Sequence, residues 1–390
     1  MKKIALILLF TFTFVVFANA DTMSKQSYSV LMKAQKFLDK QKYKEAKNLL
    51  LPLLKKELNN YEKSYVLQTL ANIAINQDDY KKTAKYYEEI IKLKGFEEKN
   101  LERIKLSLAK IYLSINKYDK SVKLLETLLS SKTLPKSDIY ENLLYATYYK
   151  KDFRKSIAYS KELFKLNKKK KESWYQILYS SYVELKQYPN AINTLKIMVK
   201  KWHGNETYWL QLIALYQETK NYKKALSTFE LAYKKNGVDP KKNTLYFVNI
   251  LVENGLYYKA AQQIEQGLQK AYLKDNKRNF ELLVSCYDYA KQKDKVINLL
   301  ASSKFAKTVK YQLLLGNIYY NQEKFGKSIK VLENINIKKG SKKDGQRNTL
   351  LALSYYELNN KKATVKYLKK AINNPYEKKR ALSIKKSLQI

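Results

Sequence analysis

Few residues of this chain have side chains suited to catalysis, and none of them forms a recognisable catalytic set. The 390 residues include one histidine, His203, and one cysteine, Cys286. Their number excludes a multi-thiolate zinc or iron–sulfur site and an internal disulfide, and no triad is recognisable around them. The nine glycines contain no Gly-x-Gly phosphate loop. We therefore expect no cofactor, no metal and no enzymatic activity.

Each remaining reactive residue has a simpler structural interpretation. His203 follows Trp202 in a predicted turn beside a glycine, and we expect it at the surface. Cys286 falls within a predicted helix and is expected to be packed. The adjacent pairs Glu88-Glu89 and Glu97-Glu98 face no second acidic cluster. The sequence therefore offers no pair of carboxylates placed for general acid–base catalysis.

The first twenty residues have the pattern of a secretory signal peptide. Lys2 and Lys3 precede the uncharged stretch 4–17, and Ala18-Asn19-Ala20 supplies small residues at a cleavage site. A fourteen-residue helix rises only about 21 Å, which is less than a membrane core of about 30 Å. We expect cleavage before Asp21 and export to the periplasm.

A short phrase recurs ten times at an interval near 34 residues. Most copies read as an aromatic residue, basic residues and a small residue, and two weaker copies lack the aromatic. They begin at Tyr43, Tyr80, Tyr118, Phe153, Tyr188, Tyr222, Tyr257, Lys293, Phe325 and Lys361. Such a period is typical of stacked supersecondary units, so we predict a repeat array and not several globular domains.

Apolar residues inside one copy follow the spacing of two helices. The first half has them at offsets 0, 3, 4 and 7, in Trp209, Leu212, Ile213 and Tyr216. The second half has them at offsets 0, 4 and 7, in Ala225, Phe229 and Ala232. Each copy is thus predicted to be a helix–turn–helix that buries its apolar face only by stacking.

These positions resemble the tetratricopeptide repeat family, whose pattern is an aromatic, Leu-Gly and Tyr, followed by Ala, Phe and Ala. A second copy matches at Leu315, Gly316, Tyr319 and Leu332, although most copies lack the Gly and the final Pro. The resemblance implies an all-α, right-handed helix–turn–helix solenoid of about ten repeats over residues 27–378. Residues 379–390 are expected to form a capping helix, and Pro135 and Pro240 to fall between repeats.

Several phrases are similar to one exported branch of that family, the periplasmic protein that accompanies TonB–ExbB–ExbD energy-transduction systems. The phrases are Leu67-Gln68-Thr69-Leu70, Trp174-Tyr175-Gln176, the segment 208–216 and Phe229-Glu230-Leu231-Ala232-Tyr233. This resemblance implies an accessory role beside a TonB-type motor that serves outer-membrane transporters.

Two sets of residues are candidate partner contacts. Trp174, Tyr175 and Tyr208 belong to the densest aromatic cluster; Trp174 and Tyr208 precede core positions by one residue, so we expect them partly exposed. By the family register, the first helix of each repeat lines a concave groove for an extended peptide. Its candidate lining residues are Gln68, Asn72, Tyr145, Tyr148, Gln176, Ser180, Gln217, Asn249, Asn317 and Tyr320. A merely solvated helix face is the alternative.

The formal net charge is +41, from 76 basic and 35 acidic residues. Only five of the basic residues are arginines, whose guanidinium groups form bidentate hydrogen bonds with phosphates. Nucleic acid is therefore not an expected partner. The lysine content has two open interpretations, a compositional habit or weak contact with anionic envelope surfaces.

Together these features predict a non-enzymatic periplasmic scaffold that binds protein partners, with TonB, ExbB or ExbD components as the sharper hypothesis. The alternative is a generic cell-envelope scaffold for outer-membrane assembly, secretion or pilus machinery. A peptidoglycan-associated enzyme would need an insertion between repeats, and the even spacing leaves no room for one.

Overall fold

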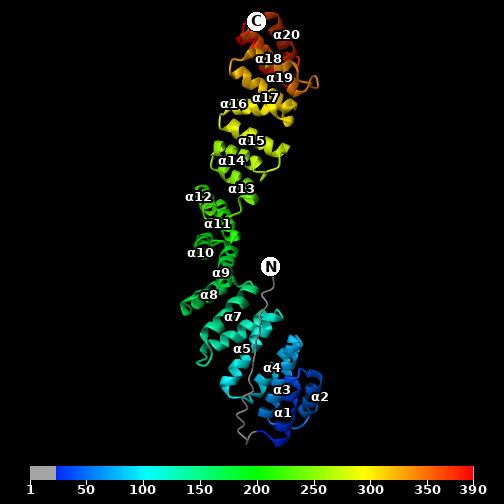
Figure 1. Ribbon diagram of the computed structural model, residues 1–390, viewed down its shortest axis with the longest axis vertical. Helices are drawn as coiled ribbons and strands as arrows, with labels where there is room; N and C mark the ends of the chain where they lie inside the picture. Colours follow the sequence, from blue (N-terminus) through cyan, green and yellow to red (C-terminus); the bar gives the residue numbers. More distant parts are fainter. Residues whose placement is uncertain (1–22, 390) are drawn as a thin grey trace. The chain divides into compact units, whose positions relative to one another are not determined.

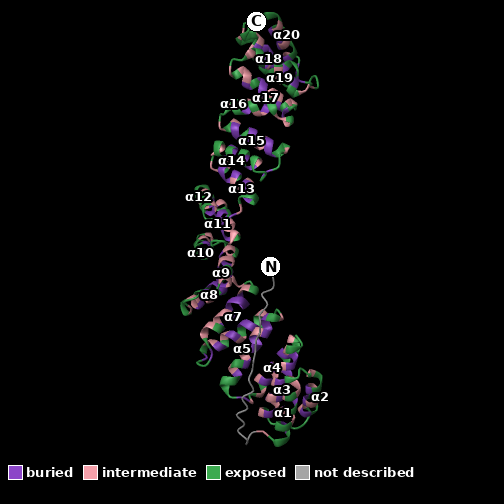
Figure 2. Ribbon diagram, in the orientation of Figure 1, coloured by how far each residue is buried: buried purple, intermediate pink, exposed green. Residues whose placement is uncertain are grey.

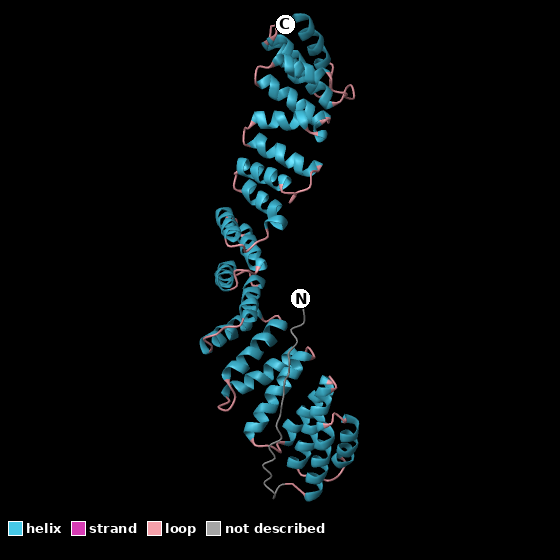
Figure 3. Ribbon diagram, in the orientation of Figure 1, coloured by secondary structure: helices cyan, strands magenta, loops and turns pink. Residues whose placement is uncertain are grey.

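The structure is a computed structural model that describes residues 23–389. Throughout this range the secondary structure is helical, with no strand (Figure 3). The predicted signal peptide and its cleavage site lie outside the described residues. None of the described helices is both long and apolar enough to cross a membrane.

The chain divides into two compact units, the first ending at Trp202 and the second beginning at His203. The first unit contains α1 (Lys25–Asp39), α2 (Tyr43–Leu54), α3 (Asn60–Asn76), α4 (Tyr80–Leu93), α5 (Glu98–Ser114), α6 (Tyr118–Thr127), α7 (Lys136–Tyr149), α8 (Phe153–Leu166), α9 (Glu172–Glu184) and α10 (Tyr188–Lys201). A short 3-10 helix, Leu128–Ser130, follows α6. In each unit the helices pack against their neighbours in the chain (Figure 1).

The second unit continues the same pattern of helix pairs. It contains α11 (Glu206–Glu218), α12 (Tyr222–Lys234), α13 (Pro240–Glu253), α14 (Tyr257–Gln269), α15 (Lys277–Tyr289), α16 (Lys293–Ser302), α17 (Val309–Asn321), α18 (Phe325–Glu333), α19 (Lys342–Glu357), α20 (Lys361–Ile372) and α21 (Lys378–Ser387). A 3-10 helix, Lys304–Ala306, precedes α17. We call the odd helix of each pair helix A and the even one helix B.

Each of the ten recurring phrases marks the first residue of a helix B. The helices α2 to α20 with even numbers begin at the ten residues named above, from Tyr43 to Lys361. The two prolines expected between repeats lie where helices begin, Pro135 at the N-cap of α7 and Pro240 as the first residue of α13. The predicted ten-repeat register is therefore confirmed at every copy, and α21 follows the last pair.

The turn between helix A and helix B has one backbone geometry in all ten repeats. One residue in each turn has a positive φ: Gln41, Asp78, Asn116, Lys151, Lys186, Lys220, Gly255, Lys291, Glu323 and Asn359. A residue in the left-handed region just after a helix satisfies the last helical carbonyls, and glycine is the residue best suited to it. Four of the ten positions are lysines, so these turns are strained relative to glycine.

Small residues near the start of helix B allow the two helices of a pair to approach closely. The Ser121 hydroxyl donates to the carbonyl of Ala109 at 2.8 Å, and Ser328 makes the same bond to Gly316 at 2.8 Å. A Cβ at Gly316 would lie 2.6 Å from a Leu332 methyl, which shows how tightly the pair is packed. These contacts explain why the recurring phrase ends in Ala, Ser or Thr in nine of the ten copies; the copy that begins at Lys293 ends in Val296.

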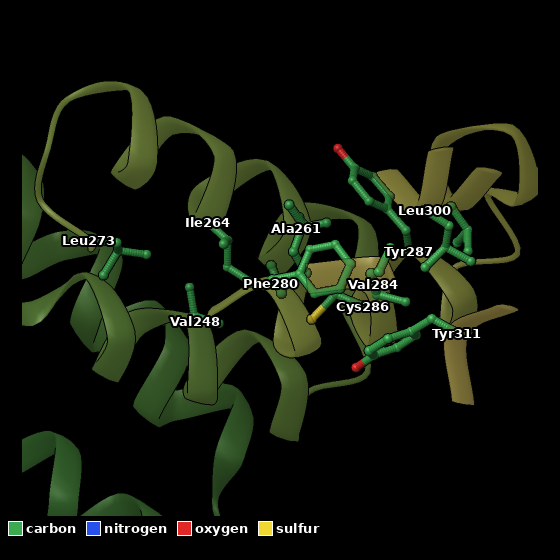
Figure 4. Packing of buried hydrophobic residues seen from close by; sticks show 14 of the residues in the cluster. Val248, Ala261, Ile264, Leu273, Phe280, Val284, Cys286, Tyr287, Leu300 and Tyr311 are labelled. Atoms are coloured by element: carbon green, nitrogen blue, oxygen red, sulfur yellow. The ribbon is translucent and has the colours of Figure 1, made fainter. Parts of the chain in front are cut away.

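The core is a series of local clusters, each shared by neighbouring repeats. In the second unit one cluster joins residues of α13 to α17, including Val248, Ile264, Phe280 and Tyr311 (Figure 4). Along both units, buried residues are interspersed with exposed ones within each helix (Figure 2). The array is therefore stabilised repeat by repeat, with each helix A covered by neighbours on more than one side.

Candidate partner-binding site

All thirteen candidate partner contacts lie on helix A, as the register predicts, and they include Gln68 in α3, Ser180 in α9 and Gln217 in α11. Asn72 is in α3, Tyr145 and Tyr148 are in α7, and α9 holds Trp174, Tyr175 and Gln176. In the second unit Tyr208 is in α11, Asn249 in α13, and Asn317 and Tyr320 in α17. The burial of these residues separates them into a packed group and an accessible group.

The aromatic residues proposed as anchors belong to the packed group. Trp174 and Tyr208 are each 3% exposed, and Tyr175 is 5% exposed. The expectation that Trp174 and Tyr208 are partly exposed is therefore wrong. The physical reason is the array itself, because the flanks of helix A that solvent would reach in an isolated pair are covered by the adjacent repeat.

A carboxylate on the preceding helix A holds the Trp174 side chain in place. The indole Nε1 donates to Oε1 of Glu141 in α7 at 2.9 Å, and Lys171 Nζ lies 2.7 Å from the same oxygen. The Lys171 ammonium also sits 5.3 Å from the Trp174 ring centroid, and the Phe164 ring packs at 6.3 Å. Trp174 thus makes structural contacts that link repeats 4 and 5, because both its indole N–H and its apolar ring have partners inside the protein.

Tyr145 takes part in the same contact between repeats 4 and 5. Its hydroxyl lies 3.3 Å from Glu141 Oε1 and 3.2 Å from the Ser173 hydroxyl. Burial raises the pKa of Tyr145 above its usual value. Glu141 and Ser173 were missed in the sequence, although Glu141 lies one turn before Tyr145 and one repeat length before Trp174.

The polar candidates form the accessible group. Gln176, Asn249 and Asn317 are exposed, whereas Asn72 and Tyr148 are half-buried. Tyr148 bonds across to the Ser180 hydroxyl at 3.0 Å. Tyr320, also half-buried, packs 5.5 Å from the Phe325 ring. The exposed residues among these candidates are therefore amides, whereas the aromatic candidates are buried or half-buried.

In the second unit the accessible positions extend into a row, one per repeat. Ala214, Asn249, Ser285 and Asn317 occupy the same register on α11, α13, α15 and α17, and all four are exposed. We call these four residues the helix A row. The Ser285 hydroxyl bonds back to the carbonyl of Glu281 in its own helix at 2.8 Å. All four residues of the row have short side chains. Ala214 and Ser285 were missed in the sequence, although extending the register from Asn249 would have found them.

Residues at the same register are less exposed in the first unit. Asn72 in α3 and Ser180 in α9 are half-buried, and Tyr145 in α7 is buried. Longer neighbours such as Glu141 and Tyr148 fill the surface there. The accessible helix A face is thus best developed in repeats 6 to 9.

The few potentially reactive residues have structural surroundings. His203 is exposed in a turn, as expected, and Cys286 is 2% exposed, with burial raising the pKa of its thiol to about 11. Glu88 accepts a hydrogen bond from Tyr112 at 2.5 Å and pairs with Lys120 at 3.3 Å, and these contacts lower its pKa. Across residues 23–389, no group of three or more His, Cys, Asp or Glu side chains is placed to hold a metal ion.

A comparison with protein families matches residues 106–151, from the middle of α5 to just past α7, to the model of the tetratricopeptide repeat. The fold is an all-α solenoid of tetratricopeptide-like helix pairs. In the rest of the chain the same helix pairs recur with the register described above. No enzyme family is indicated, and no curated protein matches the chain.

Among solved structures, a tetratricopeptide repeat protein from Parabacteroides merdae is 13% identical, with a TM-score of 0.40 over 67% of this chain and 98% of that one. The Naa15/Naa10 complex bound to HypK-THB is 15% identical, with a TM-score of 0.48 over 90% of this chain and 58% of that one. YrrB, described as a TPR protein with an unusual peptide-binding site, is 15% identical, with a TM-score of 0.35 over 49% of this chain and 97% of that one.

Proposed function

We propose that this protein is a non-enzymatic scaffold of the cell envelope that binds an extended segment of a protein partner across the helix A row. The observation that carries the proposal is the exposure of Ala214, Asn249, Ser285 and Asn317 at one register of four successive repeats. Short side chains leave room for a backbone to approach, and the two amides can each donate and accept hydrogen bonds to it.

The finer proposal concerns the partner. The phrases of repeats 2, 5 and 6 that are similar to the TonB-associated branch support an accessory role beside TonB, ExbB or ExbD in the periplasm. The sequence pattern of residues 1–20 supports export. Under this proposal the scaffold holds a component of the motor or of an outer-membrane transporter, and carries out no chemistry itself.

The test places a bulky charged side chain in the helix A row. Ser285→Arg puts a long cation in the middle of the row, at an exposed position on α15. Its matched control is Ser227→Arg on α12, because Ser227 is also an exposed serine whose hydroxyl bonds back to its own helix, to the carbonyl of Lys224 at 3.2 Å. Both variants add the same charge and volume to the same unit.

The measurement is co-purification of TonB-system components from the periplasm, together with growth that depends on a TonB-linked outer-membrane transporter. We expect Ser285→Arg to reduce both and Ser227→Arg to leave both unchanged. Capture of TonB components that is equal for the two variants would reject the helix A row. Capture of a different partner that only Ser285→Arg abolishes would retain the row and reject the TonB assignment.

A further inference from the structure

The basic residues of the second unit are concentrated along one edge. Helices alternate in direction, so the loops that lead from helix B to the next helix A all lie on the same edge, which we call the connecting edge. Its segments are 234–242, 270–278, 304–310, 333–344 and 369–380, and they contain eighteen lysines, two arginines and five acidic residues. All twenty basic residues are exposed.

The acidic residues of the connecting edge neutralise little of this charge. Glu333 accepts hydrogen bonds from the hydroxyls of Tyr355 and Tyr367, and Asp344 is 7% exposed and pairs with Arg347 of α19 at 2.7 Å. Glu377 is 5% exposed and pairs with Arg380 at 3.8 Å. Asp239 pairs with Lys242 at 3.5 Å, and Asp275 pairs with Lys304 at 3.4 Å. The remaining seventeen basic side chains form no ion pair with an acidic residue among the described residues.

The opposite edge of the same unit has a different balance. Its turns, 218–224, 253–259, 288–295, 321–327 and 357–362, contain eleven basic and six acidic residues. In the first unit the connecting loops 55–63, 92–99, 131–138 and 165–172 contain thirteen basic and six acidic residues. A compositional habit would enrich lysine everywhere without removing acidic residues from one edge, so the asymmetry needs a local cause.

We propose that the connecting edge of residues 203–390 docks on the surface of an anionic lipid bilayer. Lysines act as mobile point charges that suit a diffuse layer of anionic headgroups, and clusters of them near a membrane attract such lipids. The edge also carries two exposed tyrosines, Tyr272 and Tyr376, the latter 65% exposed. Tyrosine is enriched at membrane interfaces because its ring is apolar and its hydroxyl is polar.

The spacing of the loops allows their charges to act together. Packed helices lie about 8–10 Å apart, and α17 contacts both α18 and α19. This distance is close to the screening length of about 8 Å at physiological salt, so neighbouring loops reinforce each other's attraction. Nucleic acid is less well matched, because only Arg278 and Arg380 offer the planar fork that reads phosphates and bases.

The test is co-sedimentation of the chain from Asp21 to Ile390, which retains every described helix, with lipid vesicles. Vesicles of phosphatidylcholine alone are compared with equal parts of phosphatidylcholine and phosphatidylglycerol at about 0.15 M salt. The edge variant carries Lys338→Gln, Lys339→Gln, Lys342→Gln and Lys343→Gln. Its control carries Lys223→Gln, Lys224→Gln, Lys259→Gln and Lys295→Gln on the opposite edge, with the same loss of charge.

Each lysine at an anionic surface contributes about five-fold to partitioning, so the edge variant should bind anionic vesicles at least ten-fold less than the unaltered chain. The binding of the control variant to anionic vesicles should fall by no more than about three-fold, because its lysines contribute only to the long-range attraction between the protein and the vesicle. Circular dichroism verifies that both variants keep their helical content.

Four results would overturn the proposal. These are no binding to anionic vesicles, equal binding to neutral vesicles, an equal loss for the two variants, or tighter binding of a double-stranded DNA oligonucleotide than of anionic vesicles at the same salt. The proposal does not depend on the helix A row, and Ser285→Arg should leave vesicle binding unchanged. Failure of one proposal is therefore distinguishable from failure of the other.

Discussion

Replacement of Trp174 distinguishes a structural role, in which the side chain links two repeats, from a role in binding partners. Its indole is 3% exposed and donates to Glu141 at 2.9 Å, so Trp174→Ala removes a buried aromatic and leaves a cavity. Such changes cost about 3–5 kcal/mol of unfolding free energy. Trp174→Phe keeps most of the packing but removes the charge-assisted hydrogen bond, and should cost about 1–3 kcal/mol. Gln176→Ala, on the exposed face of the same helix, should change stability by less than about 0.5 kcal/mol.

The assay is urea unfolding followed by circular dichroism and by the fluorescence of Trp202 and Trp209, which remain in every variant. Because stability in a repeat array is local, the loss should appear as an early transition of repeats 4 and 5. The ordering of midpoints should be Trp174→Ala lowest, then Trp174→Phe, with Gln176→Ala at the level of the unaltered chain. An unchanged midpoint for Trp174→Ala would refute the reasoning, because the side chain would then be as accessible as an anchor for partners.

Four further predictions follow from single positions. Lys186→Gly in the turn after α9 should raise the melting temperature, because relief of about 1–2 kcal/mol of left-handed strain exceeds the entropic cost of glycine, about 0.4–1 kcal/mol; a lower melting temperature would contradict the positive φ. Ala225→Leu should cost about 1–3 kcal/mol by overpacking a fully buried site, whereas the loop change Lys169→Gln should leave thermal unfolding unchanged. The buried Cys286 thiol should react with a disulfide reagent only after denaturant is added, and rapid labelling of native protein would show that α15 is open. Mass spectrometry of the exported protein should give Asp21 as its first residue, and a product that keeps Lys2 would contradict cleavage.

The sequence was sufficient to predict the repeats because their chemistry is periodic. An aromatic residue at the start of helix B and a small residue three positions later recur at an interval set by one helix pair, as Tyr118 and Ser121 illustrate. The small residue is required where Ser121 reaches the carbonyl of Ala109, so the pattern has a direct structural cause. The first residue of each helix B could therefore be predicted from the sequence.

Burial of the candidate site could not be predicted in the same way. Whether Trp174 is exposed depends on Glu141 and on the adjacent repeat, and a single helical face contains neither. Conversely, Asn249 and Asn317 stay exposed because short neighbours such as Ser285 and Ala214 leave the row open. The charge asymmetry between edges likewise became visible only after each loop had been assigned to one side of the helix pairs.

The most direct test of the scaffold account is site-specific photo-cross-linking along the second unit. A photoreactive amino acid is placed at Asn249 and at Asn317 in the helix A row, and at Leu231 and Val365, which are 46% and 49% exposed on helices α12 and α20. The account predicts cross-links to a protein partner from Asn249 and Asn317 and none from Leu231 or Val365. Cross-links from the helix B positions alone, with none from Asn249 or Asn317, would contradict it.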